Sequence, residues 1–90
     1  MKRHKYIIEI DLLSEYGEFE RKGFDGKLEF AYAECARTVV NQDKRVFCIN
    51  LYKLVLSNNR YKHIARFYPS GTIETEASNF FDGLTFEFYL

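Results

Sequence analysis

The side chains that could recognise a charged partner are concentrated in one stretch of the chain. From Lys44 to Ile73 the sequence has six Lys or Arg residues and no Asp or Glu. Ammonium and guanidinium groups neutralise phosphates, and a neighbouring aromatic ring can stack on a base. The candidate binding residues lie on an expected hairpin, and they are Lys53, Arg60, Lys62, Arg66 and Tyr68. The period-two pattern places all of them on one face, except Arg60 near the turn. The alternative is an ordinary amphipathic hairpin whose long basic stems lie over apolar neighbours.

Catalytic motifs are missing from the sequence. It has no Gly-rich phosphate loop, no HExxH, no paired CxxC and no GxSxG. A nucleophile with an oriented base would need a histidine near Ser or Cys. His4 lies in a terminus that we expect to be frayed. His63 is expected mid-strand, as a hydrogen-bonded structural residue near Cys48 or Tyr52.

The carboxylates and thiols favour structural roles as well. The pairs Glu9/Asp11 and Glu18/Glu20 each share a strand face, and we expect them to be solvated edges rather than an acid–base couple. Cys35 and Cys48 are too few for a disulfide scaffold and lack metal-ligand spacing. We expect both to be small buried side chains in a reducing compartment. The sequence thus predicts no enzyme, no metal site and no cofactor.

The composition is that of one folded domain covering residues 1–90. Hydrophobic residues make up 47% and charged residues 29%, which excludes a disordered chain. Nine Phe and seven Tyr exceed what so small a core hides easily, so some should line a partner surface. No apolar run is long enough for a signal peptide or a membrane span, and we expect a cytoplasmic protein without a membrane partner.

The charges are segregated although the net charge is zero. Residues 6–20 and 74–90 carry acids without any Lys or Arg, whereas residues 44–73 carry only bases. Such blocks create local fields that the net charge conceals. The simplest outcome is that acidic and basic strands lie side by side and neutralise one another, with Arg66 opposite Glu74.

Hydrophobic periodicity predicts one helix among several strands. The helix should begin with Asp25 as its N-cap and run to about Asn41. The strands are expected at 6–12, 18–24, 45–56, 61–68, 72–77 and 84–90, separated by turns such as Asn58-Asn59, Pro69-Ser70-Gly71 and Asp82-Gly83. The predicted fold is α+β: an antiparallel sheet of about five to six strands, in the order ββαβββ(β), with the helix packed on one face.

Turn lengths assign the faces of this sheet. A two-residue turn at Asn58-Asn59 would place Leu56 opposite Tyr61 and Tyr52 opposite Ala65. The helix-covered face would then hold Val46, Cys48, Tyr52, Leu54, Ala65, Phe67 and Ile73. The other face would hold Phe47, Ile49, Leu51, Val55, Ile64 and Tyr68 with Lys53, Lys62 and Arg66. The buried stripe of the helix should be Leu28, Tyr32, Cys35, Ala36 and Val39. A slip of one residue would exchange the two faces.

The segment Leu84–Leu90 alternates between apolar and polar residues. It is expected either to complete the sheet of the monomer or to form an exposed apolar edge. An exposed edge invites pairing with a second copy. A homodimer through Leu84–Leu90, or through the apolar second face, is therefore an open possibility.

The layout resembles that of small phage-encoded anti-CRISPR proteins. The resemblance covers residues 5–76: Lys5-Tyr6-Ile7-Ile8, a charged second strand, a helix and a Tyr-rich meander. It lies in element order and size and includes no signature residues. It implies an inhibitor that docks on a nucleoprotein defence complex, in the host cytoplasm if the chain is phage-encoded.

Three functions follow as expectations. The first is a small non-enzymatic protein that docks onto another macromolecule, as such an inhibitor would. The second is a module that binds single-stranded nucleic acid directly through the same hairpin. The third is a structural domain that forms homodimers. Salt-dependent binding of a bare oligonucleotide separates the first two.

Overall fold

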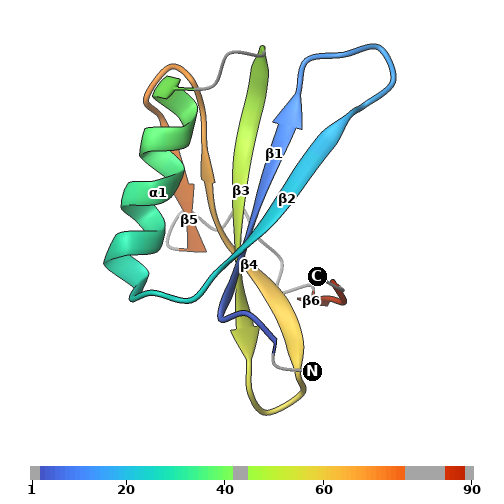
Figure 1. Cartoon of the computed structure of the whole chain (residues 1–90), viewed down its shortest axis with the longest axis vertical. Coiled ribbons are helices and arrows are strands. Elements are labelled where there is room, and N and C mark those ends of the chain that lie inside the picture. Colours follow the sequence, from blue (N-terminus) through green and yellow to red (C-terminus); the bar gives the residue numbers. More distant parts are fainter. Residues whose placement is uncertain (1–2, 42–44, 77–84, 89–90) are drawn as a thin grey trace.

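The computed structural model of the chain describes residues 3–41, 45–76 and 85–88 (Figure 1). In chain order its elements are β1 (Tyr6–Leu12), β2 (Phe19–Phe24), α1 (Leu28–Asn41), β3 (Val46–Val55), β4 (Arg60–Phe67), β5 (Ile73–Thr75) and β6 (Thr85–Phe86). The strands form one antiparallel sheet in the order β2-β1-β3-β4-β5, and β6 also pairs with β4. The expected α+β fold of a helix and an antiparallel sheet is confirmed.

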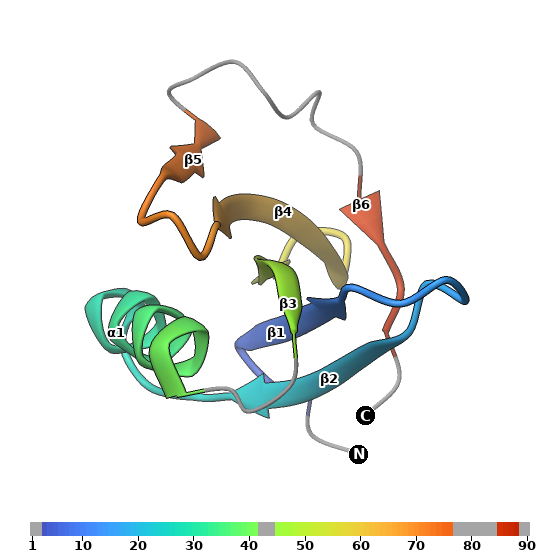
Figure 2. The same cartoon turned by 90° about the horizontal axis from the view of Figure 1, so that it is seen from above.

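The sheet has two differently covered faces. Figure 2 shows α1 beside one face, while β6 lies on the side of β4 away from the helix. The helix-side cluster is built from alternate residues of β1 and from β3, β4 and α1. Its buried members are Tyr6, Ile8, Ile10, Ala31, Cys35, Val46, Ile49, Leu51, Ile64, Ala65 and Phe67. A second cluster on the opposite face holds Ile7, Tyr52, Tyr61 and Phe88, with Leu54 and Phe86 packed against it. We call this opposite surface the second face.

The helix differs from its expected form at the N-terminal end. It begins at Leu28, and the carbonyl of Lys27 accepts the first helical hydrogen bonds, so Asp25 is not the N-cap. The Asp25 carboxylate instead accepts from the Lys5 amide at 3.0 Å and lies 2.6 Å from His4 Nδ1. His4 is therefore held in place, and the expectation of a frayed terminus is wrong for this residue.

The buried stripe of α1 is also narrower than expected. Ala31 and Cys35 are buried, and Tyr32 and Val39 are partly buried against the helix-side cluster. Leu28 is 44% exposed, and Ala36 is exposed as well.

The β3–β4 hairpin has a longer turn than two residues. Val55 pairs with Arg60, which leaves Leu56 to Asn59 as the connection. The Asn59 amide donates to the Val55 carbonyl at 2.8 Å, and Asn59 adopts a φ of 57°. Asn tolerates this left-handed conformation better than most residues. As a result Tyr61 lies opposite Leu54 rather than Leu56, and Leu56 is 87% exposed.

Two irregularities in β3 pairing correct the face assignment. The register shifts between Asp11 and Leu12, beside Phe47, and again between Leu51 and Tyr52, beside Ile64. Each extra residue moves the following side chains to the other face. Val46, Ala65 and Phe67 lie under the helix as expected. Cys48, Tyr52 and Leu54 do not, and Ile49, Leu51 and Ile64 take their places.

The Pro69-Ser70-Gly71 turn and the pairing of β4 with β5 agree with the prediction from the sequence. Pro69-Ser70-Gly71 forms a three-residue loop closed by the Tyr68 amide and the Thr72 carbonyl at 3.0 Å. Phe67 therefore lies opposite Ile73, and Arg66 opposite Glu74, as predicted. The end of the predicted 72–77 strand, the Asp82-Gly83 turn, Leu84 and Leu90 fall outside the described residues.

Candidate functional site: a groove between the helix and the hairpin

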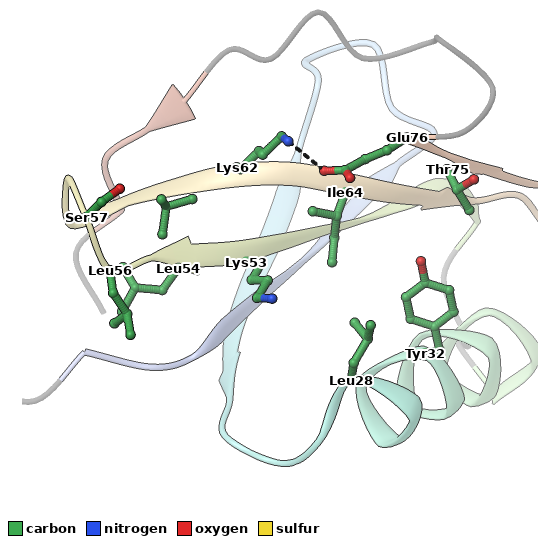
Figure 3. A pocket seen from close by; sticks show the side chains of 11 residues that line it. Leu28, Tyr32, Lys53, Leu54, Leu56, Ser57, Lys62, Ile64, Thr75 and Glu76 are labelled. Carbon is green, nitrogen blue, oxygen red and sulfur yellow. Dashed lines mark ion pairs between the residues drawn. The ribbon is translucent and has the colours of Figure 1, made fainter.

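A groove of about 720 Å³ opens between the start of α1 and the β3–β4 hairpin. Leu28 and Tyr32 come from the helix, Ile64 from β4, and Thr75 and Glu76 from the end of β5 (Figure 3). The remaining lining residues belong to the hairpin: Lys53, Leu54, Val55, Leu56, Ser57 and Lys62. Ligand sites of about 300–1,000 Å³ with mainly apolar walls and few polar groups are typical of proteins. The groove has this size, and its lining mixes aliphatic side chains with polar and charged ones.

Lys53 and Lys62 are the two cations of the groove. They lie directly opposite each other on β3 and β4. Like charges in such a cross-strand pair repel, which disfavours the fold unless an anion lies between or beside them. Glu76 supplies this anion, because its Oε1 forms an ion pair with Lys62 Nζ at 3.0 Å (Figure 3). In the part of the chain that the structure describes, no acidic side chain pairs with Lys53.

The helix supplies the opposite wall of the groove. Figure 3 shows Leu28 and Tyr32 pointing from α1 toward the side of the sheet that carries Lys53 and Ile64. Burial, together with the Glu76 carboxylate, raises the pKa of Tyr32. Its phenol therefore stays protonated at neutral pH and can donate a hydrogen bond. The groove thus combines apolar side chains with a phenolic hydroxyl and an ammonium group that has no acidic partner among the described residues.

The other three predicted binding residues lie elsewhere. Arg60 is occupied by the C-terminal segment, because its Nε donates to Thr85 Oγ1 at 2.8 Å and its Nη1 lies 3.1 Å from Glu87 Oε1. Arg66 Nε donates to Asn50 Oδ1 at 2.8 Å on the second face. Tyr68 packs edge-on against Phe47, with ring centroids 6.4 Å apart. The bulge beside Ile64 lies between Lys62 and Arg66, and for that reason the two cations do not share a face.

A polar network fills the middle of the second face. Glu9 is only 8% exposed and Asn50 only 2%. Arg21 Nε donates to Glu9 Oε1 at 2.8 Å, and Asn50 Nδ2 donates to Asp11 Oδ2 at 3.0 Å. The expectation that Glu9 and Asp11 form a solvated edge is therefore wrong, although Glu18 and Glu20 are exposed as expected. Pairing with β2 on one side and β3 on the other makes β1 an interior strand, so its side chains are buried.

Burial governs protonation in this network. It raises the pKa of Glu9, against the lowering effect of its hydrogen bond from Arg21. It raises the pKa of the Cys48 thiol to about 11 and that of the Cys35 thiol to about 12. Both cysteines are free and buried, as predicted. Thiolate, the nucleophilic form, is therefore scarce at neutral pH at either position.

His63 stacks on Tyr52, with ring centroids 4.8 Å apart and planes at 27°. Burial, and then the charge of Arg66, lower the pKa of His63 to about 4, so the ring is neutral at physiological pH. The predicted contact of His63 with Tyr52 is confirmed. Across residues 3–41, 45–76 and 85–88, no group of three or more His, Cys, Asp and Glu side chains could hold a metal ion.

Sequence reasoning missed the groove residues Leu28, Tyr32 and Glu76 as binding candidates. Leu28 and Tyr32 were assigned to the core because helical periodicity does not tell a core stripe from a groove wall. The available signal for Glu76 was its place in the acidic segment that begins where the basic segment ends.

Comparison of the chain with protein-family models, with curated proteins and with solved structures found no match. The described residues contain no helix long and apolar enough to cross a membrane. The groove and its charges are therefore the basis for assigning a function.

Proposed function

We propose that this protein is a small, non-enzymatic binding domain that docks onto another macromolecule through the groove between α1 and the β3–β4 hairpin. The observation that carries the proposal is Lys53, which lies opposite Lys62 in the groove and pairs with no acidic side chain among the described residues. Because Glu76 already pairs with Lys62, an acidic or phosphorylated group of the partner would pair with the Lys53 ammonium group. Apolar side chains next to that group would lie against Leu28 and Leu56, which line the groove and are exposed.

The partner we propose is a nucleoprotein complex of the CRISPR type in a host cytoplasm. The support is the layout resemblance to phage-encoded inhibitors, which occupy nucleic-acid grooves or subunit surfaces of such complexes. The guide or target strand bound in such a complex supplies phosphate groups that Lys53 and Lys62 could contact. Lys53 and Lys62 are then the contact residues among the five basic and aromatic candidates, whereas Arg60 and Arg66 stabilise the fold.

Direct binding of bare single-stranded nucleic acid is the competing function. That mode needs basic and aromatic side chains along one surface. The separation of Lys53 and Lys62 from Arg66 and Tyr68 makes such a surface shorter than the sequence indicates. We therefore favour the protein-docking function.

The test is a double variant, Lys53→Glu with Lys62→Glu, which reverses the charge of both groove lysines. Association with purified CRISPR effector complexes is measured at two salt concentrations, and a single-stranded oligonucleotide is titrated separately. Charges at the rim of an interface mainly set the association rate, so we expect the variant to associate at least about tenfold more slowly at low salt, with a smaller difference at high salt.

Lys5→Glu is the control, since Lys5 is exposed and does not line the groove. Unchanged association of the double variant at both salt concentrations would contradict the proposal. Equal loss in the Lys5 variant would show a general charge effect instead. Tight, salt-dependent binding of the oligonucleotide alone would favour the nucleic-acid module.

A further inference from the structure

The C-terminal segment Thr85–Phe88 is attached to the domain in the way that a bound peptide is attached. Its strand β6 pairs antiparallel with the outer edge of β4, with Phe86 opposite Tyr61 and Thr85 opposite Lys62. Addition of a short strand to a free sheet edge is a common mode of peptide recognition, in which backbone bonds give affinity and side-chain pockets give specificity.

Two arginines from other parts of the chain clamp the segment. Arg60 Nη2 donates to the Thr85 carbonyl at 3.2 Å, and Arg60 Nη1 lies 3.1 Å from the Glu87 carboxylate. Arg3 Nη2 donates to the Phe88 carbonyl at 2.9 Å. The backbone carbonyls at both ends of the segment are thus hydrogen-bonded by arginines. The acidic side chain between the two phenylalanines, Glu87, forms an ion pair with Arg60.

The two phenylalanines fill an aromatic surface on the second face. Their rings lie 5.5 Å (Phe86) and 4.8 Å (Phe88) from the Tyr52 ring, centroid to centroid, both edge-on. Phe88 also contacts Tyr61 at 5.6 Å, and the Arg21 guanidinium lies 4.5 Å from its ring centroid. The recognised pattern is therefore aromatic–acidic–aromatic in an extended backbone.

This site is separate from the packing that holds the helix to the sheet. Its aromatic residues form their own cluster, and no residue of Thr85–Phe88 belongs to the helix-side cluster. Departure of the segment would expose Tyr52 and Tyr61 while leaving the core under α1 in place.

We propose that this β4-edge site also binds the Thr85–Phe88 segment of a second copy, so that two chains exchange these segments and form a dimer. The second copy is the occupant because it carries the same segment, which already satisfies every contact of the site. The proposal is independent of the groove function. A tethered segment acts at an effective concentration in the millimolar range. The exchanged dimer should therefore form at protein concentrations of about 1 mM. At micromolar concentration the chains should be mostly monomeric.

The test exploits the pair Arg60–Glu87 with two full-length variants, Arg60→Glu and Glu87→Arg. Within either variant the site and its own segment carry like charges. In the exchanged heterodimer both sites meet a segment of opposite charge. We expect the equimolar mixture to dimerise at a concentration about tenfold lower than either variant alone, as measured by sedimentation equilibrium.

The matched control is the single chain carrying both Arg60→Glu and Glu87→Arg, in which the charges match within one molecule. It should associate no more strongly than the unmodified chain. If the mixture of folded single variants dimerises no better than its components, the exchange is overturned. Dimerisation of the control to the same extent as the mixture would overturn it too.

A second measurement uses the unmodified chain, so it does not depend on any variant folding. At about 1 mM we expect a dimer that an excess of a peptide with the sequence of residues 84–90 converts to monomers. The same peptide with Phe88→Ser should have at least about tenfold less effect. A chain that stays monomeric at this concentration, or a dimer that ignores the peptide, would contradict the proposal.

Discussion

Single side chains of the second face take the protonation state that burial imposes. The pKa of Glu9 is raised and that of His63 is lowered, and in both cases the first cause is loss of water around the charged form. Each group is thereby shifted toward its neutral state. The network around Asn50 offsets this for Glu9 with the Arg21 hydrogen bond. His63 is stabilised as a neutral ring stacked on Tyr52.

The lowered pKa of His63 predicts a pH dependence of stability. The unfolded chain takes up a proton near the ordinary value of 6.5, whereas the folded chain does so only near 4. The folded state therefore binds fewer protons between these values, and its stabilisation is complete above pH 6.5 and lost as the pH falls toward 4. Between pH 7 and 5 the free energy of unfolding should fall by about 1–2 kcal/mol more in the unmodified chain than in His63→Gln, the lower figure allowing for solvent screening of the partly exposed ring. Urea unfolding of both chains at each pH measures the difference. The pH dependence caused by Asp and Glu titration is the same in both chains and cancels in the comparison. Equal losses in the two chains would contradict the assignment.

At the scale of elements, α1 is attached to the sheet along a narrow line. Ala31 and Cys35 are fully covered, and Val39 packs on the helix-side cluster one turn further on. The two fully covered side chains along this line, Ala31 and Cys35, are both small. Larger residues on either side, such as Leu28, are left partly exposed at the groove.

Neighbouring valines in the helix test this attachment. Val39→Asp would bring an unpaired carboxylate into the helix-side cluster, and such burial costs several kcal/mol in a domain of marginal stability. Val40→Asp is the matched control, because Val40 is 81% exposed. We expect the Val39 variant to lose about 3 kcal/mol or to unfold, and the Val40 variant to change by less than about 1 kcal/mol. Thermal melting followed by circular dichroism measures both. Equal melting temperatures would be incompatible with the observed packing of α1.

Periodicity predicts the elements but not the parity of their side chains. The alternation in Tyr6–Leu12 and the three-four spacing in α1 are strong patterns, and both elements were predicted almost to the residue. The bulges beside Phe47 and Ile64 have no such signal, because an extra residue in a strand leaves its composition unchanged.

The same contrast between predictable strands and unpredictable bulges applies to the candidate site. Lys53 and Lys62 could be grouped from the sequence because they flank the turn before any bulge intervenes. Arg66 could not be assigned to the correct face of the sheet from the sequence, because it follows the bulge at Ile64. Glu76 could not be assigned to Lys62 either, because the pairing depends on where the chain returns after the Pro69-Ser70-Gly71 loop.

Over the whole molecule, the segregated charges of the sequence are brought together. Glu76 and Glu87 come from the acidic end of the chain, and they pair with Lys62 and Arg60 of the basic segment. The expected mutual neutralisation of acidic and basic segments is thus seen in the described residues. One consequence is that, among the described groove residues, Lys53 is the cation whose charge no ion pair offsets.

The bond between Arg3 and the Phe88 carbonyl joins residues that are 85 positions apart in the chain. A short linker in place of residues 89–90 and 1–2 could therefore connect Phe88 to Arg3, and new ends could be opened between Glu15 and Tyr16 in the exposed loop after β1. Such loops tolerate circular permutation when no buried backbone is cut. In the permuted chain β1 would be made last and would have to enter between β2 and β3. Native-like spectra would mean that the sheet is specified by its contacts alone, whereas slow or failed refolding would reveal that β1 and β2 must pair early.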